Sequence, residues 1–289
     1  MIKKPKLWFA VSIATMAVSI AVIGIIRPIW GIDFTGGSLL EYRSAENINA
    51  SDIASALSEA LAMDVTVQTT GEDSVIVRTS ALSPEQHEKA QTVLVDRELI
   101  REELRFESIG PTIGQELRRK AWVAINLAVV VIVIYLAYTF RKAAGLIASW
   151  KFGVAAVVAL IHDLLFVTAL FVILGKFFGA SIDTLFMTAM LAILGYSVND
   201  TIIIFNRLKE DWLISRRGML IDIMDDAVKS TLIRSLNTSI TTLFVLAMLL
   251  VFGGETIRWF IVALSVGILV GTYSSIFIAP AVLYTLAKK

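Results

Sequence analysis

The feature of this sequence that most constrains its fold is a set of six long apolar runs. A bilayer core about 30 Å thick requires roughly 20 apolar residues in a helix rising about 1.5 Å per residue. The runs cover residues 7–26, 122–140, 152–174, 185–205, 234–252 and 259–286. Only 18% of the residues are charged, against about 25% in soluble domains. The sequence therefore predicts an α-helical polytopic membrane protein with six transmembrane helices.

The distribution of basic residues predicts the orientation of these helices. Thirteen Lys or Arg residues fall in the short segments on one side, at 3–6, 141–151, 207–229 and 288–289, whereas the opposite short loops contain only Lys176 and Arg258. The first run exceeds the usual apolar length of a signal peptide and lacks a cleavage site, so we expect it to remain as an anchor. The positive-inside rule then places both termini in the cytoplasm and residues 27–121 outside.

The external segment, residues 27–121, is predicted to form one α/β domain. Strands are expected at 38–43, 65–69, 75–79 and 105–109, and helices at 51–62 and 83–104. Ser83-Pro84-Glu85-Gln86 has the pattern of a capping box with proline at the first helical position. The order β-α-β-β-α-β is that of a ferredoxin-like domain with helices on one face of a sheet.

Two further segments carry structural expectations. The pair Gly36-Gly37 lacks the lysine and hydroxyl residue of a phosphate-binding loop, so we expect a tight turn at the base of the external domain. Residues 206–233 form a cytoplasmic connection with apolar residues at helical spacing from Leu220. This pattern predicts an amphipathic helix on the membrane surface or beneath the bundle, or alternatively a docking site for a partner.

Composition excludes several classes of function. The formal charge of +1 gives no electrostatic reason to expect nucleic acid as a partner. The absence of cysteine excludes disulfides, thiolate catalysis and cysteine-ligated metals, and two histidines are too few for an imidazole-rich metal site. We therefore expect no metal and no cofactor; the lipid bilayer is the environment of the chain.

Ionisable residues at membrane depth are the candidate functional residues. Each costs at least about 2.5–3.5 kcal/mol near the bilayer centre. Asp200 follows Asn199 in the fourth run, and Arg234, Thr238 and Thr241 share a helical face of the fifth. If these faces oppose each other, Asp200 and Arg234 form a switchable proton site to which Asn199 and the threonines donate hydrogen bonds. The alternative is a static ion pair, with Arg234 extending towards the headgroups.

The third and sixth runs contain a second polar site and a packing motif. His162 and Asp163 are adjacent, so their side chains point about 100° apart and cannot both face one partner. They form either a secondary polar site or a structural one. Gly267, Gly271 and Ser275 recur at a spacing of four, which predicts close packing of helices.

Several motifs, in order along the whole chain, resemble the SecF family of bacterial protein-export subunits, members of the resistance-nodulation-division superfamily. They are Ile-Asp-Phe-Thr-Gly-Gly at 32–37, Ser-Ile-Gly-Pro at 108–111, His-Asp at 162–163, Gly-Tyr-Ser-Val-Asn-Asp-Thr at 195–201, Arg234 with Thr-Ser-Ile-Thr-Thr at 238–242, and Gly-Thr-Tyr-Ser-Ser at 271–275.

The resemblance implies a non-enzymatic auxiliary subunit in the bacterial inner membrane. Such a subunit would assemble with SecD, associate with the SecYEG translocon and use the proton motive force to help export polypeptides. It also implies that Asp200 and Arg234 are the proton-coupling residues and that SecD supplies a further carboxylate and the second six-helix half.

Two other functions remain open from the residues alone. One is a proton-driven exporter of small molecules or lipids, although such pumps usually carry both halves in one chain. The other is an intramembrane aspartyl protease that uses Asp163 and Asp200, although the sequence lacks the Gly-x-Gly-Asp pattern of those enzymes.

Overall fold

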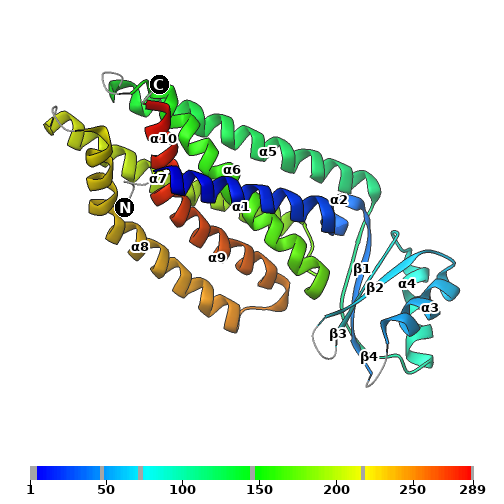
Figure 1. Cartoon of the computed structure of the whole chain (residues 1–289). Helices are drawn as coiled ribbons and strands as arrows, with labels where there is room; N and C mark the ends of the chain where they lie inside the picture. The colour runs from blue at the N-terminus through cyan, green and yellow to red at the C-terminus, as the bar shows by residue number, and fades with distance from the viewer. Residues whose placement is uncertain (1–4, 46–48, 71–73, 144–146, 216–218, 288–289) are drawn as a thin grey trace. The chain divides into compact units, whose positions relative to one another are not determined.

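The computed structural model describes residues 5–45, 49–70, 74–143, 147–215 and 219–287. This part of the chain contains six helices long and apolar enough to cross a membrane, and a four-stranded antiparallel sheet (Figure 1). The predicted fold class is confirmed. The chain divides into two compact units, one of residues 1–25, 123–170 and 185–289, the other of residues 26–122 and 171–184.

The first unit is a helical bundle of six elements. They are α1 (Pro5–Ile26), α5 (Pro111–Thr139), α6 (Ser149–Phe178), α7 (Thr184–Ser215), α8 (Leu220–Phe252) and a sixth helix made of α9 (Arg258–Tyr273), η3 (Ser274–Ile278) and α10 (Ala279–Ala287). Short 3-10 turns, η1 (Phe140–Ala143) and η2 (Glu255–Ile257), precede α6 and α9. Phe152 stacks on Phe140 at 4.6 Å between ring centroids and meets Phe205 edge-on at 5.3 Å. These three buried rings join α6 and α7 at one end of the bundle.

The helix α8 differs from the sequence prediction in its extent. An amphipathic helix within 206–233 and a separate span at 234–252 were expected, but a single helix runs from Leu220 to Phe252. No glycine or proline interrupts these residues, and Thr231 bonds to the Ala227 carbonyl within the helix. Its buried residues Met224 and Val228 pack in the same core as Phe205, which agrees with packing beneath the bundle.

The sixth span contains a π-helical turn, η3, at Ser274–Ile278. Such a turn inserts an extra residue into the helical repeat and is frequent at functional sites. Ser274 and Ser275, the first two residues of this turn, are both completely buried.

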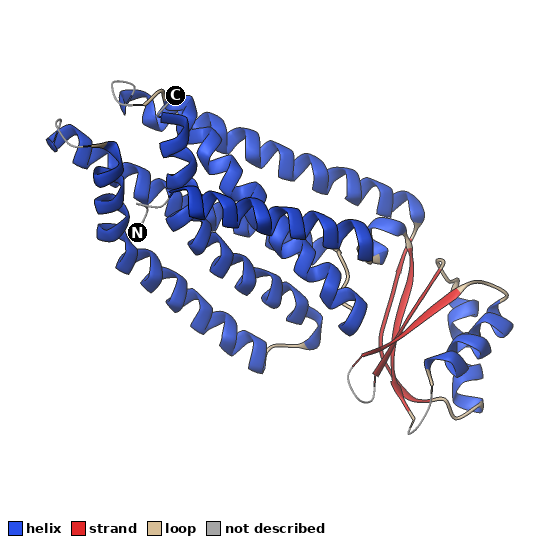
Figure 2. Ribbon diagram, in the orientation of Figure 1, coloured by secondary structure: helices blue, strands red, loops and turns tan. Residues whose placement is uncertain are grey.

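The second unit contains the α/β domain. Its elements are α2 (Ile32–Thr35), β1 (Gly37–Ser44), α3 (Ala50–Leu61), β2 (Val65–Thr70), β3 (Ser74–Thr79), α4 (Pro84–Asp96) and β4 (Ile100–Ile109). The strand order is β2-β3-β1-β4, with α3 and α4 on one face of the sheet (Figure 2). Leu40, Tyr42, Ile53, Leu57 and Leu94 form the core between these layers.

The start of the second domain helix is confirmed, and its predicted end is wrong. The Ser83 hydroxyl accepts a bond from the Gln86 amide, and the Gln86 side chain accepts one from the Ser83 amide, which is the expected capping box. However, α4 ends at Asp96 instead of 104, and Glu98 adopts a positive φ of 55°. The residues after Ile100 favour helix individually, but their pairing with β1 outweighs that preference.

The base of the domain requires glycine at two adjacent positions. Gly36 and Gly37 have φ values of 72° and 127°, a region that side chains with a Cβ rarely adopt. A Cβ on Gly36 would lie 2.7 Å from Pro111 Cα, and one on Gly37 would lie 2.5 Å from the Thr79 carbonyl oxygen. The predicted tight turn therefore brings the start of β1 against the start of α5 and the end of β3.

The connection between α6 and α7 belongs to the same compact unit as the sheet. Arg78 of β3 donates to the Gly179 carbonyl at 3.1 Å and to Gln68 at 2.7 Å, and Gln68 donates to the Gly175 carbonyl at 3.1 Å. Burial lowers the pKa of the Arg78 guanidinium, and the nearby Asp183 carboxylate opposes that shift. The segment that joins two membrane helices is thus hydrogen-bonded to the domain.

Candidate functional site

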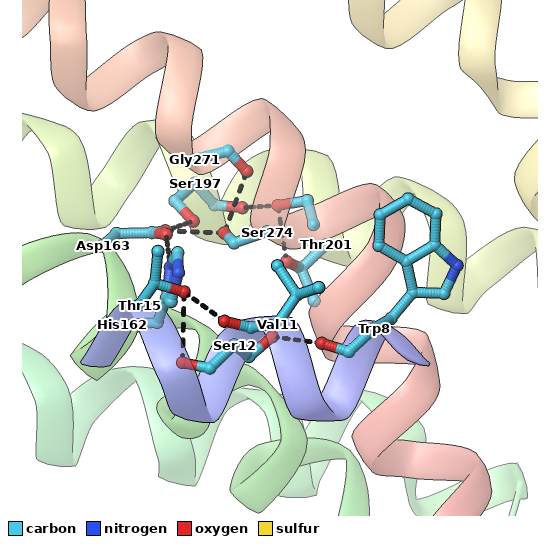
Figure 3. A network of polar contacts seen from close by, with 11 residues as sticks. Trp8, Val11, Ser12, Thr15, His162, Asp163, Ser197, Thr201, Gly271 and Ser274 are labelled. Atoms are coloured by element: carbon cyan, nitrogen blue, oxygen red, sulfur yellow. Dashed lines mark hydrogen bonds and ion pairs between the residues drawn. The ribbon is translucent and has the colours of Figure 1, made fainter. Parts of the chain in front are cut away.

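The Asp163 carboxylate is the centre of a buried polar cluster that joins three helices (Figure 3). Asp163 has 0% exposure. One oxygen, Oδ2, accepts hydrogen bonds from Ser197 Oγ of α7 at 2.8 Å and Ser274 Oγ of η3 at 2.7 Å. The other, Oδ1, lies 3.1 Å from His162 Nδ1. A carboxylate provides enough acceptor sites for all three donors, so one side chain of α6 ties α7 and the sixth helix together.

A second row of hydroxyl contacts extends this cluster towards the next turn of α7. Ser275 donates to the Ser197 carbonyl at 2.9 Å, and its hydroxyl shares a 2.9 Å bond with Thr201. All these side chains are buried. Because Thr201 follows Asp200 in the chain, the polar network reaches the turn of α7 that carries the predicted proton site.

A third contact joins α8 to α9. Ser239 and Thr272 have hydroxyl oxygens 2.5 Å apart, and Tyr196 of α7 donates to Ser239 at 3.4 Å. Ser239 and Thr272 also bond to carbonyls of their own helices. Small hydroxyl residues therefore allow α7, α8 and α9 to approach closely at membrane depth.

Asp200 is buried in α7, with 1% exposure. Its Oδ2 atom has no hydrogen-bond partner. The neighbouring Asn199 lies on the exposed face of the same helix, about 100° away around the helix axis. Asp200 and Asn199 therefore do not act on the same surface of this chain.

The structure does not bring Arg234 into an ion pair with Asp200. Arg234, Thr238 and Thr241 all lie on the exposed side of α8, and the part of the chain described here contains no salt bridge between the two charged groups. The buried face of α8 instead carries Ser235 and its helical neighbours. Small hydroxyl side chains fit the tight contact with α7 and α9 better than a guanidinium does.

His162 and Asp163 contact each other, which the sequence argument did not anticipate. Adjacent side chains leave a helix about 100° apart, yet Nδ1 of His162 lies 3.1 Å from Oδ1 of Asp163. Asp163 faces the interior of the bundle, whereas His162 also lines a groove against α1. His162 thus connects the polar cluster around Asp163 with this groove.

The glycines of the sixth helix provide close packing, as their spacing suggested. A Cβ on Gly267 would overlap the Ile193 side chain, and one on Gly271 would lie 3.0 Å from Ser197 Cβ. The second contact allows Ser197 to reach Asp163. Packing at Gly271 and polar contact at Asp163 are therefore parts of one arrangement.

The hydroxyl residues that complete the site were not predicted from the sequence. Ser197, Thr201, Ser274 and Ser275 are ordinary residues for a membrane helix, and none costs much to bury. A usable signal was the adjacency of two serines in an apolar helix, since neighbouring hydroxyls point to different helices. Across the described ranges, no three His, Cys, Asp or Glu side chains gather in a way that could hold a metal.

The fold and the site together define a polytopic membrane protein with one α/β domain between its first two spans and carboxylates buried between helices. Residues 90–289 match the family described as protein export membrane protein SecD/SecF, C-terminal. The chain therefore belongs to this family of protein-export membrane proteins.

Individual relatives place the chain within the SecF group. It is 39% identical over 271 residues to the protein translocase subunit SecF of Thermobaculum terrenum, which covers 90% of this chain and 84% of that protein. It is 35% identical over 257 residues to SecF of Pseudomonas aeruginosa, covering 88% and 80%.

A solved structure has the same fold. The crystal structure of SecDF, a translocon-associated membrane protein from Thermus thermophilus, matches 100% of this chain with a TM-score of 0.88 and 30% identity. This chain spans 38% of the length of that protein. A second SecDF structure, in a super-membrane-facing form, matches with a TM-score of 0.69.

Proposed function

We propose that this chain is a non-enzymatic auxiliary subunit of the Sec translocon that couples the proton motive force to polypeptide export across the bacterial inner membrane. The observation that carries the proposal is the Asp200 carboxyl group, which is buried in an apolar helix with one oxygen unpartnered. An ionisable group in such a position is costly and is usually retained for ion movement. Proton uptake removes its charge and lowers the cost of that position.

A partner half is needed to complete the site. Asn199 and Arg234 lie exposed on α7 and α8 of this chain, at a depth where lipid offers them no hydrogen bonds. Thr238 and Thr241, on the same side of α8 as Arg234, bond to carbonyls of their own helix. A polar surface of this kind favours a protein neighbour, and SecD is the partner that the SecDF relatives supply. In the assembly, a carboxylate of SecD would face Arg234. Protonation of Asp200 would then remove its attraction for Arg234 and favour the ion pair between Arg234 and SecD.

The path from the proton site to the α/β domain runs through α6 and α7. These helices carry Asp163 and Asp200, and their connection is bonded to β2 and β3 through Gln68 and Arg78. A shift of either helix on protonation therefore reaches the domain that would handle the emerging polypeptide. The expected topology, with cytoplasmic termini, places that domain on the side where the polypeptide leaves SecYEG.

The proposal is tested by gradient-dependent export in membrane vesicles that contain SecYEG, SecD and this subunit. Asp200→Asn keeps the size and polarity of the side chain but removes its proton, so the stimulation of export by the proton gradient is expected to be lost. Arg234→Met should have the same effect, whereas Arg234→Lys keeps the charge and should retain part of it.

Two controls separate a lost function from a lost structure. Asp226→Asn changes an exposed acidic residue of α8 and should leave export unchanged. Co-purification of SecD with each variant shows that the subunit is inserted and assembled. If Asp200→Asn assembles normally and still responds to the gradient, the proposed coupling is refuted.

A further inference from the structure

A groove of about 430 Å³ lies between α1, α6 and α9 and is separate from the Asp200 site. Most of its lining is apolar, but it includes two titratable residues that the mechanism above does not use, His162 and Tyr273. The other lining residues are Trp8, Val11, Thr15, Phe166, Leu269 and Val270. All eight belong to the same compact unit.

Two polar atoms on residues that line this groove are buried and have no partner. They are Nε2 of His162, a residue with 2% exposure, and the hydroxyl of Tyr273. Their rings lie 6.1 Å apart. Buried polar groups are nearly always hydrogen-bonded, often to ordered water. A groove of this volume has room for several water molecules, each of which occupies about 30 Å³ in the liquid.

The opposite edge of the imidazole already has a partner. His162 Nδ1 lies 3.1 Å from Asp163 Oδ1 (Figure 3), and the same residue lines the groove, so the ring contacts both the groove and the buried carboxylate. A histidine with one nitrogen on each side of a barrier can pass a proton through the ring.

We propose that this groove holds water and that His162 carries protons between that water and Asp163. A hydrated proton in the groove binds Nε2, which leaves a neutral water and makes the ring a cation. The proton on Nδ1 then moves to Asp163 Oδ1, which leaves a neutral acid and a neutral ring with its proton on Nε2. In the reverse direction Asp163 returns its proton to Nδ1 and Nε2 releases one to groove water, so the ring regains its first tautomer. This inference rests on the proposed function, because it gives the proton a second route into the bundle.

The surroundings of His162 restrict which groups take part. The titratable groups beside it are Asp163 on its own helix and Tyr273 on α9. The α1 helix contributes Thr15, whose hydroxyl is bonded to the Val11 carbonyl of the same helix. Asp163 accepts a bond from the Ser197 hydroxyl, and the Ser275 hydroxyl bonds to the Ser197 backbone carbonyl and to Thr201, the residue after Asp200.

Water in the groove can be tested directly because the natural chain contains no cysteine. Val11→Cys places a thiol in the groove, and Ile13→Cys places one at nearly the same depth of α1, where Ile13 is 54% exposed and lies outside the groove lining. A charged, water-soluble methanethiosulfonate is added to proteoliposomes of the full chain with SecD. Since only the hydrated thiolate reacts, Val11→Cys should react at least about tenfold faster than Ile13→Cys. Equal rates would mean that lipid fills the groove, which overturns the proposal.

The relay is tested with two replacements of His162. His162→Asn keeps an amide donor for Asp163 but cannot transfer a proton, and His162→Phe removes both properties. Relay predicts that proton-driven export falls by at least about tenfold in both variants and loses its dependence on external pH. If His162→Asn keeps the native rate and pH dependence of export, His162 only positions Asp163 and the proposed relay is wrong.

The two proposals fail in different ways. If the proposed function is wrong, export by the Asp200→Asn variant is unchanged, whatever the thiol labelling shows. Failure of the relay leaves Asp200→Asn inactive while His162→Asn keeps the native rate and pH profile. The labelling of Val11→Cys in the His162→Asn background also reports whether that variant retains the native groove.

Discussion

Replacing Asp163 with alanine is expected to lower the free energy of unfolding of the helical bundle by about 1–3 kcal/mol. Asp163 accepts hydrogen bonds from Ser197 and Ser274, which belong to two other helices. An interhelical hydrogen bond in a membrane protein contributes about 0.6 kcal/mol on average and about 1.7 kcal/mol at most. The range follows from two such bonds. Ser274 also lies 3.1 Å from the Gly271 carbonyl, an alternative acceptor that favours the lower half of the range.

The assay is reversible unfolding of the full chain in mixed micelles, followed by tryptophan fluorescence as the denaturing detergent increases. Asp226→Ala is the matched control, because Asp226 is an exposed acidic residue of α8, and its change should stay within about 0.5 kcal/mol. Asp163→Asn keeps one acceptor oxygen, so its loss should be smaller than that of Asp163→Ala. The reasoning is refuted if Asp163→Ala unfolds at the same detergent fraction as the control.

Three further changes test other parts of the structure. Gly37→Ala is expected to destabilise the α/β domain by at least about 1–3 kcal/mol, because φ is 127° and the new methyl would lie 2.5 Å from the Thr79 carbonyl oxygen; thermal unfolding measures this. Gly267→Ala should weaken the α7–α9 contact by about 1–3 kcal/mol through overlap with Ile193, measured by detergent unfolding. Burial raises the pKa of Tyr42, so above pH about 10, the ordinary tyrosine value, the unfolded chain loses this proton while the folded domain keeps it. The domain should therefore keep its full stability below that pH and lose stability above it, and Tyr42→Phe should remove this loss in alkaline melting curves.

Each of these changes has a matched control. Gly110→Ala meets no atom within 4 Å and should melt like the native domain. Ile193→Ala removes all three side-chain atoms that lie nearest to a Cβ at position 267 and should recover stability when combined with Gly267→Ala; a double variant no more stable than Gly267→Ala contradicts the packing argument. A native alkaline midpoint retained in Tyr42→Phe would show that another group titrates.

The helices and most strands could be predicted because their signals are local. Apolar runs of about 20 residues have few other uses, and the short segments 65–69 and 75–79 were predicted as strands and are found within β2 and β3. The end of α4 could not be predicted, because Ile100 and the residues after it have helical preferences that only their pairing with β1 overrides. Local preference carries no information about a strand that lies about 60 residues away.

The candidate site could likewise be predicted only in part from the sequence. Burial cost alone identified Asp163, Asp200 and His162 as unusual residues at membrane depth. The partner of each one depends on how the helices are rotated, and rotation depends on packing of small residues such as Gly271 against Ser197. Periodicity allowed Arg234 to face Asp200 if the two helical faces opposed each other, whereas packing buries Ser235 and leaves Arg234 exposed.

The sequence by itself determined that this chain spans a membrane six times, carries one α/β domain between its first two spans and places acidic groups among apolar helices, because hydrophobic length and the cost of burying charge act on each segment separately. Only the tertiary structure decided that Asp163 is the acceptor joining α6, α7 and the sixth helix, that His162 contacts both a groove and that acceptor, and that Arg234 faces outward. These features arise from contacts between residues far apart in the chain, and their geometry depends on helix rotation within a close-packed bundle.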